Sequence, residues 1–264
     1  MNSKPLMATW AAMLLAGCSV TQPPKESEAD PKVAPASAEE DAGLRCAQEV
    51  KALPAQPATQ APPPVDLVFW CTKAAQRGDR QAQWILAGLY ERGLGVPPSQ
   101  SEAFRWTQAA AGQGLAEAQF HLGQMYGRGE GVALDRRTAT LWYRKAADQG
   151  HLQALYYMGY RAQHGKGMPQ SLTEAVGWYQ KAAEGGQAEA MAGLGTLSQQ
   201  GQGVPQNLVE AYKWFNLAAV SGYKPFKTLR DRVAQRLTAG QLAEGQRLAS
   251  EWVQRHPGVV IATP

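Results

Sequence analysis

The chain repeats itself at a fixed interval of 36 residues from about residue 65 to residue 222. Tryptophan recurs at this interval at Trp70, Trp106, Trp142, Trp178 and Trp214. Glycines and pairs of alanines keep the same register, and no insertion breaks it. A period of this length is typical of a helical solenoid, in which a unit too small to bury its own apolar face is completed by its neighbours.

Each unit carries two apolar stripes with helical spacing. In the second unit the stripes are Ala118, Leu122 and Tyr126, then Ala139, Trp142 and Ala146. We therefore expect two helices per unit, helix A and helix B. Gly129 is expected to end helix A in the left-handed conformation, and Gly131 to let the chain reverse tightly. The tryptophans are expected in the core, with a row of ligand-stacking indoles as the alternative.

The repeated residues resemble a known family. The pattern Ala-x-x-x-Leu-Gly-x-x-Tyr-x-x-Gly-x-Gly-Val, followed by Ala-x-x-Trp-Tyr-x-x-Ala-Ala-x-x-Gly, is similar to the Sel-one-like repeat, a relative of the tetratricopeptide repeat. Four copies are complete, at about 79–114, 115–150, 151–186 and 187–222. Departures include Ala87 in place of the glycine found at Gly123, and Thr107 in place of the tyrosine found at Tyr143.

The resemblance implies an all-α fold, a right-handed α-solenoid of stacked helix-turn-helix repeats. Four full repeats at 79–222 are expected to follow an N-terminal partial repeat at 43–78. Residues 223–256 are expected to form capping helices, because Phe226, Leu229, Val233 and Leu237 follow a helical stripe and Thr238 with Gln241 has the signature of a capping box. His256-Pro257 then ends the helix, and 257–264 is expected to be a disordered tail.

The N-terminus has the features of an export signal. Lys4 precedes the apolar run Leu6 to Ala16, which is too short for a permanent membrane span. Leu15-Ala16-Gly17-Cys18 resembles the bacterial lipobox, which implies a signal peptide at 1–17 and lipidation, including palmitate, at Cys18. An ordinary secretory signal that contains a cysteine is the alternative. By the sorting rule of the lipoproteins it resembles, Ser19 favours the outer membrane.

Residues 18–42 are rich in Pro, Ala, Glu and Ser without an apolar period, so we expect a disordered tether. A short helix is expected over 44–53. If Cys18 carries lipid, Cys46 and Cys71 remain as an even pair in an exported protein, which suggests a disulfide. Two buried free thiols are the alternative.

The sequence lacks the motifs of common catalytic sites. The four histidines have no metal-ligand spacing, and neither H-E-x-x-H nor G-x-S-x-G occurs. The Gly-x-Gly loops follow helices and lack the end of a phosphate-binding loop. The net charge of +4 is spread along the chain, which argues against a nucleic-acid interface. We therefore expect no catalytic residue, metal, cofactor or nucleic-acid partner.

In the related solenoids, helix A lines the concave face that binds partners. The candidate partner-binding residues are the non-repeating positions of helix A in two copies: His121, Gln124, Arg128, Tyr157, Tyr160 and His164. Tyrosine and arginine are favoured as anchors at protein interfaces. Ordinary exposed polar surface is the alternative.

These observations lead to two functional hypotheses. The first is a lipid-anchored scaffold of the cell envelope, facing the periplasm, that gathers other envelope or secretion proteins on its concave face. The second is a peptidoglycan-binding or cell-wall-modifying accessory protein, for which location is the only motivation. The inner membrane or the cell surface remains a possible site for the scaffold.

Overall fold

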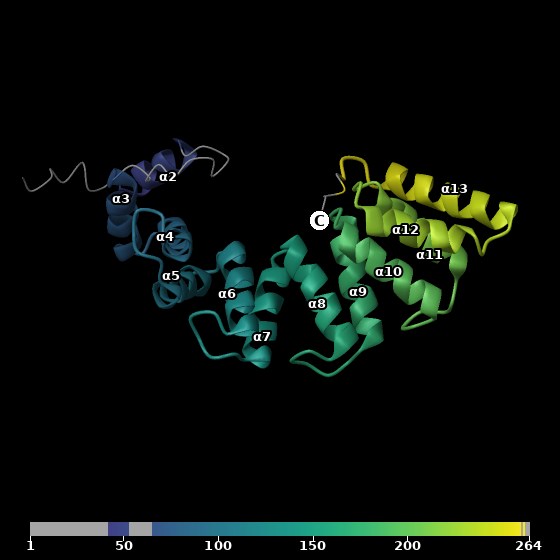
Figure 1. Ribbon diagram of the computed structural model, residues 1–264, viewed down its shortest axis with the longest axis horizontal. Helices are drawn as coiled ribbons and strands as arrows, with labels where there is room; N and C mark the ends of the chain where they lie inside the picture. The colour runs from purple at the N-terminus through teal and green to yellow at the C-terminus, as the bar shows by residue number, and fades with distance from the viewer. Residues whose placement is uncertain (1–41, 53–64, 260, 262–264) are drawn as a thin grey trace, which may run out of the picture.

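The computed structural model describes residues 42–52, 65–259 and 261, which form twelve α-helices and no strand. The helices are α2 (Ala42–Ala52), α3 (Val65–Gln76), α4 (Arg80–Arg92), α5 (Gln100–Gly112), α6 (Ala116–Arg128), α7 (Arg136–Asp148), α8 (Leu152–His164), α9 (Leu172–Glu184), α10 (Ala188–Gln200), α11 (Leu208–Ala219), α12 (Lys224–Ala234) and α13 (Ala239–Arg255). They follow one another along an arc with α2 and α13 at its two ends (Figure 1). The expected all-α repeat array is confirmed.

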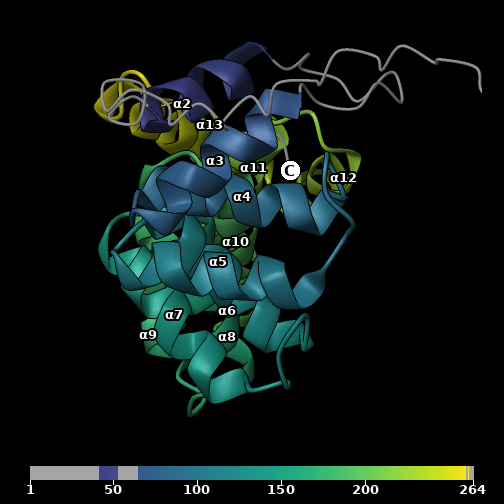
Figure 2. The same cartoon turned by 90° about the vertical axis from the view of Figure 1, so that its left-hand side faces the viewer.

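Each repeat consists of a packed helix pair. Helices A are α4, α6, α8 and α10, and helices B are α5, α7, α9 and α11; each B helix also packs against the A helix that follows it. Helix α3 has the place of a B helix without its A partner. Figure 2 shows α3, α4 and α5 stacked in chain order. Stacking neighbours bury the apolar faces that one helix pair leaves exposed.

Capping side chains set the starts of the B helices. Ser99, Asp135, Ser171 and Asn207 are the N-cap residues, and each accepts a hydrogen bond from a backbone N–H three residues later. These bonds satisfy donors that the first helical turn leaves unpaired. The four residues keep the 36-residue interval, so this polar N-cap position is a further part of the repeat pattern.

The two glycines in the turn after helix A have different structural roles. Gly129 caps α6 with a φ of 77°, which confirms the expected left-handed end. Gly131, with a φ of 69°, lies against the first turn of α5, where an added Cβ would overlap the carbonyl oxygen of Gln100. The second glycine is therefore required both for the turn and for close contact with the preceding repeat.

The structure corrects the expected place of the tryptophans. Only Trp106 is buried, and the other four indoles are half-buried. The core position is the next residue in the chain, occupied by Cys71, Thr107, Tyr143, Tyr179 and Phe215. Successive residues on a helix point about 100° apart, so a one-residue difference moves a side chain from the core to its edge.

The five indoles nevertheless have one kind of contact in common. A basic side chain lies over each ring, with the cation 4.0–4.9 Å from the ring centroid: Arg45 over Trp70, Arg105 over Trp106, Lys145 over Trp142, Lys181 over Trp178 and Lys213 over Trp214. The cations come from different positions: Arg105 and Lys213 precede their tryptophans by one residue, Lys145 and Lys181 follow theirs by three, and Arg45 belongs to α2. The indoles cover the edge of the core beneath a layer of cations.

In the second, third and fourth repeats, a glycine on helix A makes room for the buried ring on helix B. A Cβ added at Gly123 would lie 2.9 Å from the Tyr143 ring, and one at Gly195 would lie 2.7 Å from the Phe215 ring. In the first repeat Ala87 replaces this glycine and Thr107 replaces the ring. The two departures therefore compensate in volume.

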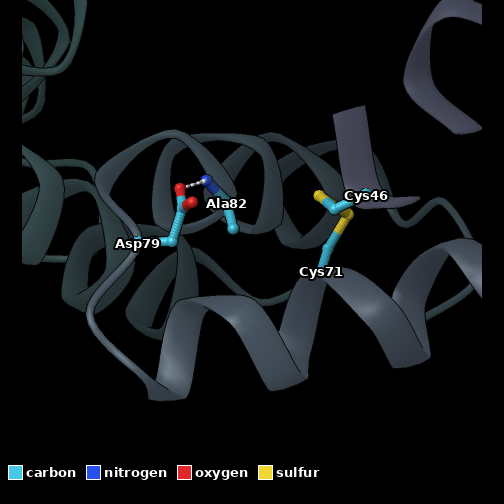
Figure 3. Close-up of a disulfide and its surroundings, with 4 residues drawn as sticks. All are labelled: Cys46, Cys71, Asp79 and Ala82. Carbon is cyan, nitrogen blue, oxygen red and sulfur yellow. Dashed lines mark hydrogen bonds between the residues drawn. A yellow bond between two sulfur atoms is a disulfide. The ribbon is translucent and has the colours of Figure 1, made fainter. Parts of the chain in front are cut away.

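The N-terminal end is closed by a covalent bond. Cys46 of α2 and Cys71 of α3 form a disulfide, and both residues are fully buried (Figure 3). Asp79 begins the first full repeat next to it by accepting a 2.8 Å hydrogen bond from the Ala82 N–H. The expected disulfide is confirmed, and the expected short helix is found as α2.

The C-terminal end is closed by two helices. Trp252 of α13 is buried and its ring centroid lies 6.2 Å from that of Trp214 in α11. Thr238 and Gln241 form the expected capping box, and α13 ends at Arg255 just before His256-Pro257. The role of 223–256 as a cap stays a prediction.

The expected signal peptide and lipidated Cys18 lie outside the described residues, as does all of the expected tether except residue 42. Among the described residues, no helix has the length and hydropathy needed to cross a bilayer.

Candidate partner-binding groove

A groove rich in tyrosine lies where α8, α9, α10 and the start of α12 meet. Its volume is about 510 Å³. We name it the tyrosine groove; its lining residues are Tyr156, Tyr160, Gln163, Tyr179, Glu189, Ala192, Gly193, Thr196, Tyr223 and Phe226. The size suits one or a few side chains of a partner protein, because ligand sites of about 300–1,000 Å³ are typical.

Helical spacing places the aromatic walls of the groove. Tyr156 and Tyr160 are four residues apart on α8, so their side chains share one face. Tyr223 is the N-cap residue of α12, and its ring lies 5.0 Å from that of Phe226 in the next turn. The capping helix therefore contributes one wall, and a repeat supplies the other.

Small residues keep the groove open between these walls. Gly193 of α10 lies against Tyr179, and a Cβ added there would lie 3.0 Å from the Tyr179 ring. Ala192 and Thr196 are its neighbours in the lining. Large side chains at these positions of α10 would fill the space that the tyrosines surround.

The groove offers hydroxyl groups that stay protonated. Burial raises the pKa of Tyr179, whose hydroxyl donates a 2.8 Å hydrogen bond to Oε1 of Gln163. Burial also raises the pKa of Tyr156, and the nearby negative charge of Glu189 raises it further. Glu189 is held by a 2.7 Å hydrogen bond from Nε2 of Gln187. The groove therefore combines aromatic area, neutral hydroxyls and one carboxylate.

The structure divides the predicted residues of the third repeat. Tyr160 lines the groove; its hydroxyl accepts a 2.8 Å hydrogen bond from Nζ of Lys166, and its ring lies 4.5 Å from that of His164. Tyr157 is not part of the lining. Its half-buried ring packs 5.4 Å from that of Phe120 and 5.3 Å from that of Tyr143, both of which are buried.

The predicted residues of the second repeat make polar contacts outside the tyrosine groove. His121 contacts Oε1 of Gln124 through Nδ1 at 3.3 Å and Oε2 of Glu91 through Nε2 at 3.4 Å. Arg128 pairs with Glu130 at 3.6 Å at the end of α6. The structure does not bring these residues into the tyrosine groove. Whether they contact a partner stays a prediction.

Of the six residues proposed as partner-binding, only Tyr160 lines this groove. The lining residues that were not proposed include Tyr156, Gln163, Tyr179, Tyr223 and Phe226. One signal for Tyr156 was available, because the equivalent positions carry Trp84, Phe120 and Ala192 and so depart from the repeat pattern. No such signal exists for Tyr223 and Phe226, which come from the cap. Their place beside α8 depends on the curvature of the whole array.

The chemistry of the groove favours binding over catalysis. Within the described part of the chain, no three His, Cys, Asp or Glu side chains converge in a way that could hold a metal ion. The groove lining includes a single carboxylate and no histidine, cysteine or lysine. Tyrosines supply large contact area with a polar end, which is typical of anchors in protein interfaces.

Comparison with family models identifies the repeats. The Sel1 repeat model matches residues 80–115, 116–151, 152–187 and 188–223, which is more than half of the chain. Each match begins one residue after the boundary read from the sequence. A comparison with curated proteins finds no match.

Two solved structures share this architecture. One is c5321 of uropathogenic Escherichia coli, described as a protective antigen displaying an SLR fold; it is 29% identical over 83% of this chain and 46% of that one, with a TM-score of 0.71. The other is a Sel1 repeat protein from Oxalobacter formigenes, 36% identical over 64% of this chain and 49% of that one, with a TM-score of 0.59. This chain therefore spans about half the length of the two structures.

Proposed function

Because the chain belongs to the Sel1 repeat family, we propose that it is a lipid-anchored adaptor of the cell envelope that binds a partner protein in the tyrosine groove. Sel1 repeats generally mediate protein–protein interactions and form a scaffold that is generally non-catalytic. The observation that supports a specific binding site here is the groove itself, with its four tyrosines and one phenylalanine at the junction of repeat and cap.

The repeats provide an internal argument for this site. Positions required by the fold recur in every copy, as the turn glycines do. Tyr160 does not recur, since its equivalents are Gly88, Gln124 and Thr196. The position of Tyr156 is aromatic in the two preceding repeats, as Trp84 and Phe120, and is Ala192 in the next. Residues that the fold does not require, gathered around one groove, are favoured candidates for recognition.

Site-directed crosslinking in living cells tests the groove. A photoreactive residue at position 160 should capture a discrete partner for mass spectrometry, and one at Val220, an exposed residue in the turn after α11, should not capture it. The double variant Tyr156→Ala with Tyr160→Ala should reduce recovery of the partner about ten-fold or more, as loss of interface anchors does. Val220→Ala is the matched control. Unchanged capture by the folded double variant would refute the groove as the binding site.

The anchor is the second part of the proposal. Leu15-Ala16-Gly17-Cys18 supports lipidation at Cys18, and more than one acyl chain makes membrane attachment stable. Ser19 supports the outer membrane, with the protein facing the periplasm. Radioactive palmitate should label the wild-type protein and leave Cys18→Ala unlabelled. A wild-type protein that carries no label and is released from the membrane would instead indicate an ordinary secretory signal. Membrane fractionation distinguishes outer membrane, inner membrane and cell surface.

Cell-wall binding is the competing outcome. The protein is mixed with purified peptidoglycan and centrifuged. If the adaptor proposal is correct, the protein should stay in the supernatant. Strong pelleting that does not depend on Tyr156 and Tyr160 would favour a wall-binding accessory protein.

A further inference from the structure

A second groove lies along α7 and the connection between α8 and α9. Its main part has a volume of about 900 Å³ and is lined by Arg137, Leu141, Arg144 and Met168, among others. A smaller pocket continues from Arg144 to Trp178 and Lys181 of α9. We name these six residues together the arginine groove. It shares no residue with the tyrosine groove.

The exposed face of α7 supplies one side of this groove. Arg137, Leu141 and Arg144 are spaced by four and three residues, so they lie on the same face. All three are exposed, and Leu141 keeps 61% of its surface accessible. An exposed leucine between two arginines is unusual, because the solvent-facing side of a helix carries mainly charged and polar residues.

The other repeats show that the fold does not require these residues. Positions equivalent to Arg137, Leu141 and Arg144 carry Ser101, Arg105 and Gln108 in the first repeat, Thr173, Gly177 and Gln180 in the third, and Val209, Lys213 and Asn216 in the fourth. Neither a pair of arginines nor an exposed leucine recurs. Since all four copies adopt the same helix pair, the fold does not require the residues of the second copy.

The basic groups of the groove form no close ion pair within the part of the chain that the structure describes. Among the described residues, no carboxylate lies within ion-pair distance of Arg137, Arg144 or Lys181. Two carboxylates lie nearby. Asp135 is already the N-cap of α7 and accepts from the backbone N–H groups of Arg137 and Thr138, and Glu174 lines the pocket beside Trp178.

The apolar part of the groove is held open by packing. Cζ of Arg144 lies 5.9 Å and Nζ of Lys181 lies 4.9 Å from the Trp178 ring centroid, which fixes the indole between two cations. Gly177 lines the pocket beside it, and a Cβ added there would meet no atom within 4 Å. Leu141 and Met168 therefore border the main part of the groove, Trp178 borders the smaller pocket, and Arg144 lines both.

We propose that the arginine groove binds an acidic segment of a protein that also places an apolar side chain against Leu141 and Met168. The two arginines and Lys181 supply electrostatic complementarity to Asp and Glu side chains. The apolar border requires an apolar complement, which a peptide carries and a bare phosphate does not. This second site would allow the protein to hold two partners, or two parts of one partner, at separate places on the array.

Selection from a displayed library of random twelve-residue peptides tests the chemistry of the ligand. The full chain in mild detergent should enrich peptides with Asp or Glu flanking Leu, Ile, Phe or Trp. The same selection on Arg137→Gln with Arg144→Gln should lose that set. Enrichment of neutral or basic peptides, or an acidic set that both proteins select equally, would overturn the proposal.

Affinity of the leading peptide, measured by fluorescence anisotropy, separates the two parts of the site. The arginine double variant should bind about ten-fold more weakly, a loss of about 1.4 kcal/mol, and added salt should weaken the wild type more than the variant. Leu141→Ser should weaken binding several-fold without changing the salt dependence. The control is Arg232→Gln with Arg236→Gln, which removes two exposed charges at the end of α12 and should leave affinity unchanged.

Three outcomes contradict the proposal. An equal loss of affinity in the control would mean that binding follows net charge alone. Full binding of a peptide whose apolar residues are replaced by serine would mean that the groove only attracts anions. Soluble dioctanoyl phosphatidylglycerol is the probe for a lipid ligand. If it displaces the peptide more strongly than unlabelled peptide does, and if this effect depends on Arg137 and Arg144, the groove faces a lipid surface. The tyrosine-groove variants serve as a further control, since they should retain the peptide.

Discussion

At the scale of single residues, the pairing of a glycine with a ring is the main determinant of packing inside each repeat. Gly123, Gly159 and Gly195 each leave the space that a buried ring of the following helix fills. The first repeat meets the same requirement with Ala87 and Thr107. The exchange has a consequence, because the Thr107 hydroxyl is buried without a hydrogen-bond partner and so weakens this repeat.

Gly123→Ala should therefore destabilise the protein although alanine is the better helix former. The added methyl group would overlap the Tyr143 ring and cost about 1–3 kcal/mol of unfolding free energy, as overpacking does. Gly88→Ala in α4 is the matched control, because its Cβ would meet only the end of the Arg92 side chain at 3.7 Å. That variant should be more stable by about 0.8–1.0 kcal/mol. Urea denaturation measures both, and equal effects would contradict the packing described.

His151 gives the stability a dependence on pH. It is the N-cap of α8, and its Nδ1 accepts a 3.2 Å hydrogen bond from the Ala154 N–H, which requires a neutral ring. Burial lowers the pKa of His151, against a smaller opposing effect of Glu117. Because the folded-state pKa is depressed, the contribution is present above the ordinary histidine pKa of about 6.5 and is lost as pH falls through the folded-state value.

We expect acidification from pH 7.5 to pH 5, the range in which a histidine of pKa about 6.5 titrates, to lower the melting temperature of the wild type. His151→Asn should reduce that dependence, since asparagine caps a helix without titrating. His164→Asn, at an exposed position, should not reduce it. Parallel melting curves for His151→Asn and wild type over this range would show that His151 is not responsible.

At the scale of the helix, burial separates two neighbouring aromatic residues of helix B. Only 3% of Tyr143 is exposed, because its ring packs against Gly123. Trp142 is half-buried at the core edge, with Nζ of Lys145 4.0 Å from its centroid. The larger residue is therefore expected to contribute less to stability than the smaller one.

Tyr143→Ala should cost about 3–5 kcal/mol, as truncation of a buried ring does. Trp142→Ala should cost about 1–2 kcal/mol, because part of the indole already contacts water. Chemical denaturation of both variants measures the difference. A larger loss for Trp142→Ala would return the indole to the core position that the sequence analysis assigned to it.

At the scale of the whole molecule, the two ends of the array are closed by different means. A disulfide holds α2 against α3 at the N-terminal end. At the C-terminal end α13 packs on α11, where a Cβ added at Gly245 would lie 2.7 Å from the Tyr212 ring. An uncovered terminal repeat would expose the apolar face of α11, including the buried Phe215 and Tyr212.

Deletion of residues after 222 should therefore lower solubility and the melting temperature, and size-exclusion chromatography with light scattering should detect aggregates. A milder variant, Gly245→Ala, should lower the melting temperature without exposing α11 completely. Gly240→Ala in the same helix is the control, because nothing lies within 4 Å of its added Cβ. A soluble, monomeric deletion variant with an unchanged melting temperature would show that α12 and α13 are not a cap.

The features that depend on local chain conformation followed from the sequence. The 36-residue period gave the helix pairs, Gly129 gave the end of helix A, and Thr238 with Gln241 gave the capping box, because backbone preferences and neighbours three or four residues away determine these features. The sequence favoured the pairing of Cys46 with Cys71 over two free thiols, and the structure contains this disulfide.

Only the tertiary structure decided which side of each helix B is innermost and which residues form a groove. Periodicity identifies a stripe but not its centre, so Trp142 could not be distinguished from Tyr143 until helix A was packed against it. The tyrosine groove joins Tyr156 to Phe226 across two helix pairs and the cap, and that proximity comes from the accumulated rotation of successive repeats. A rotation of this kind is a property of the packed array, which no single repeat encodes in its own pattern.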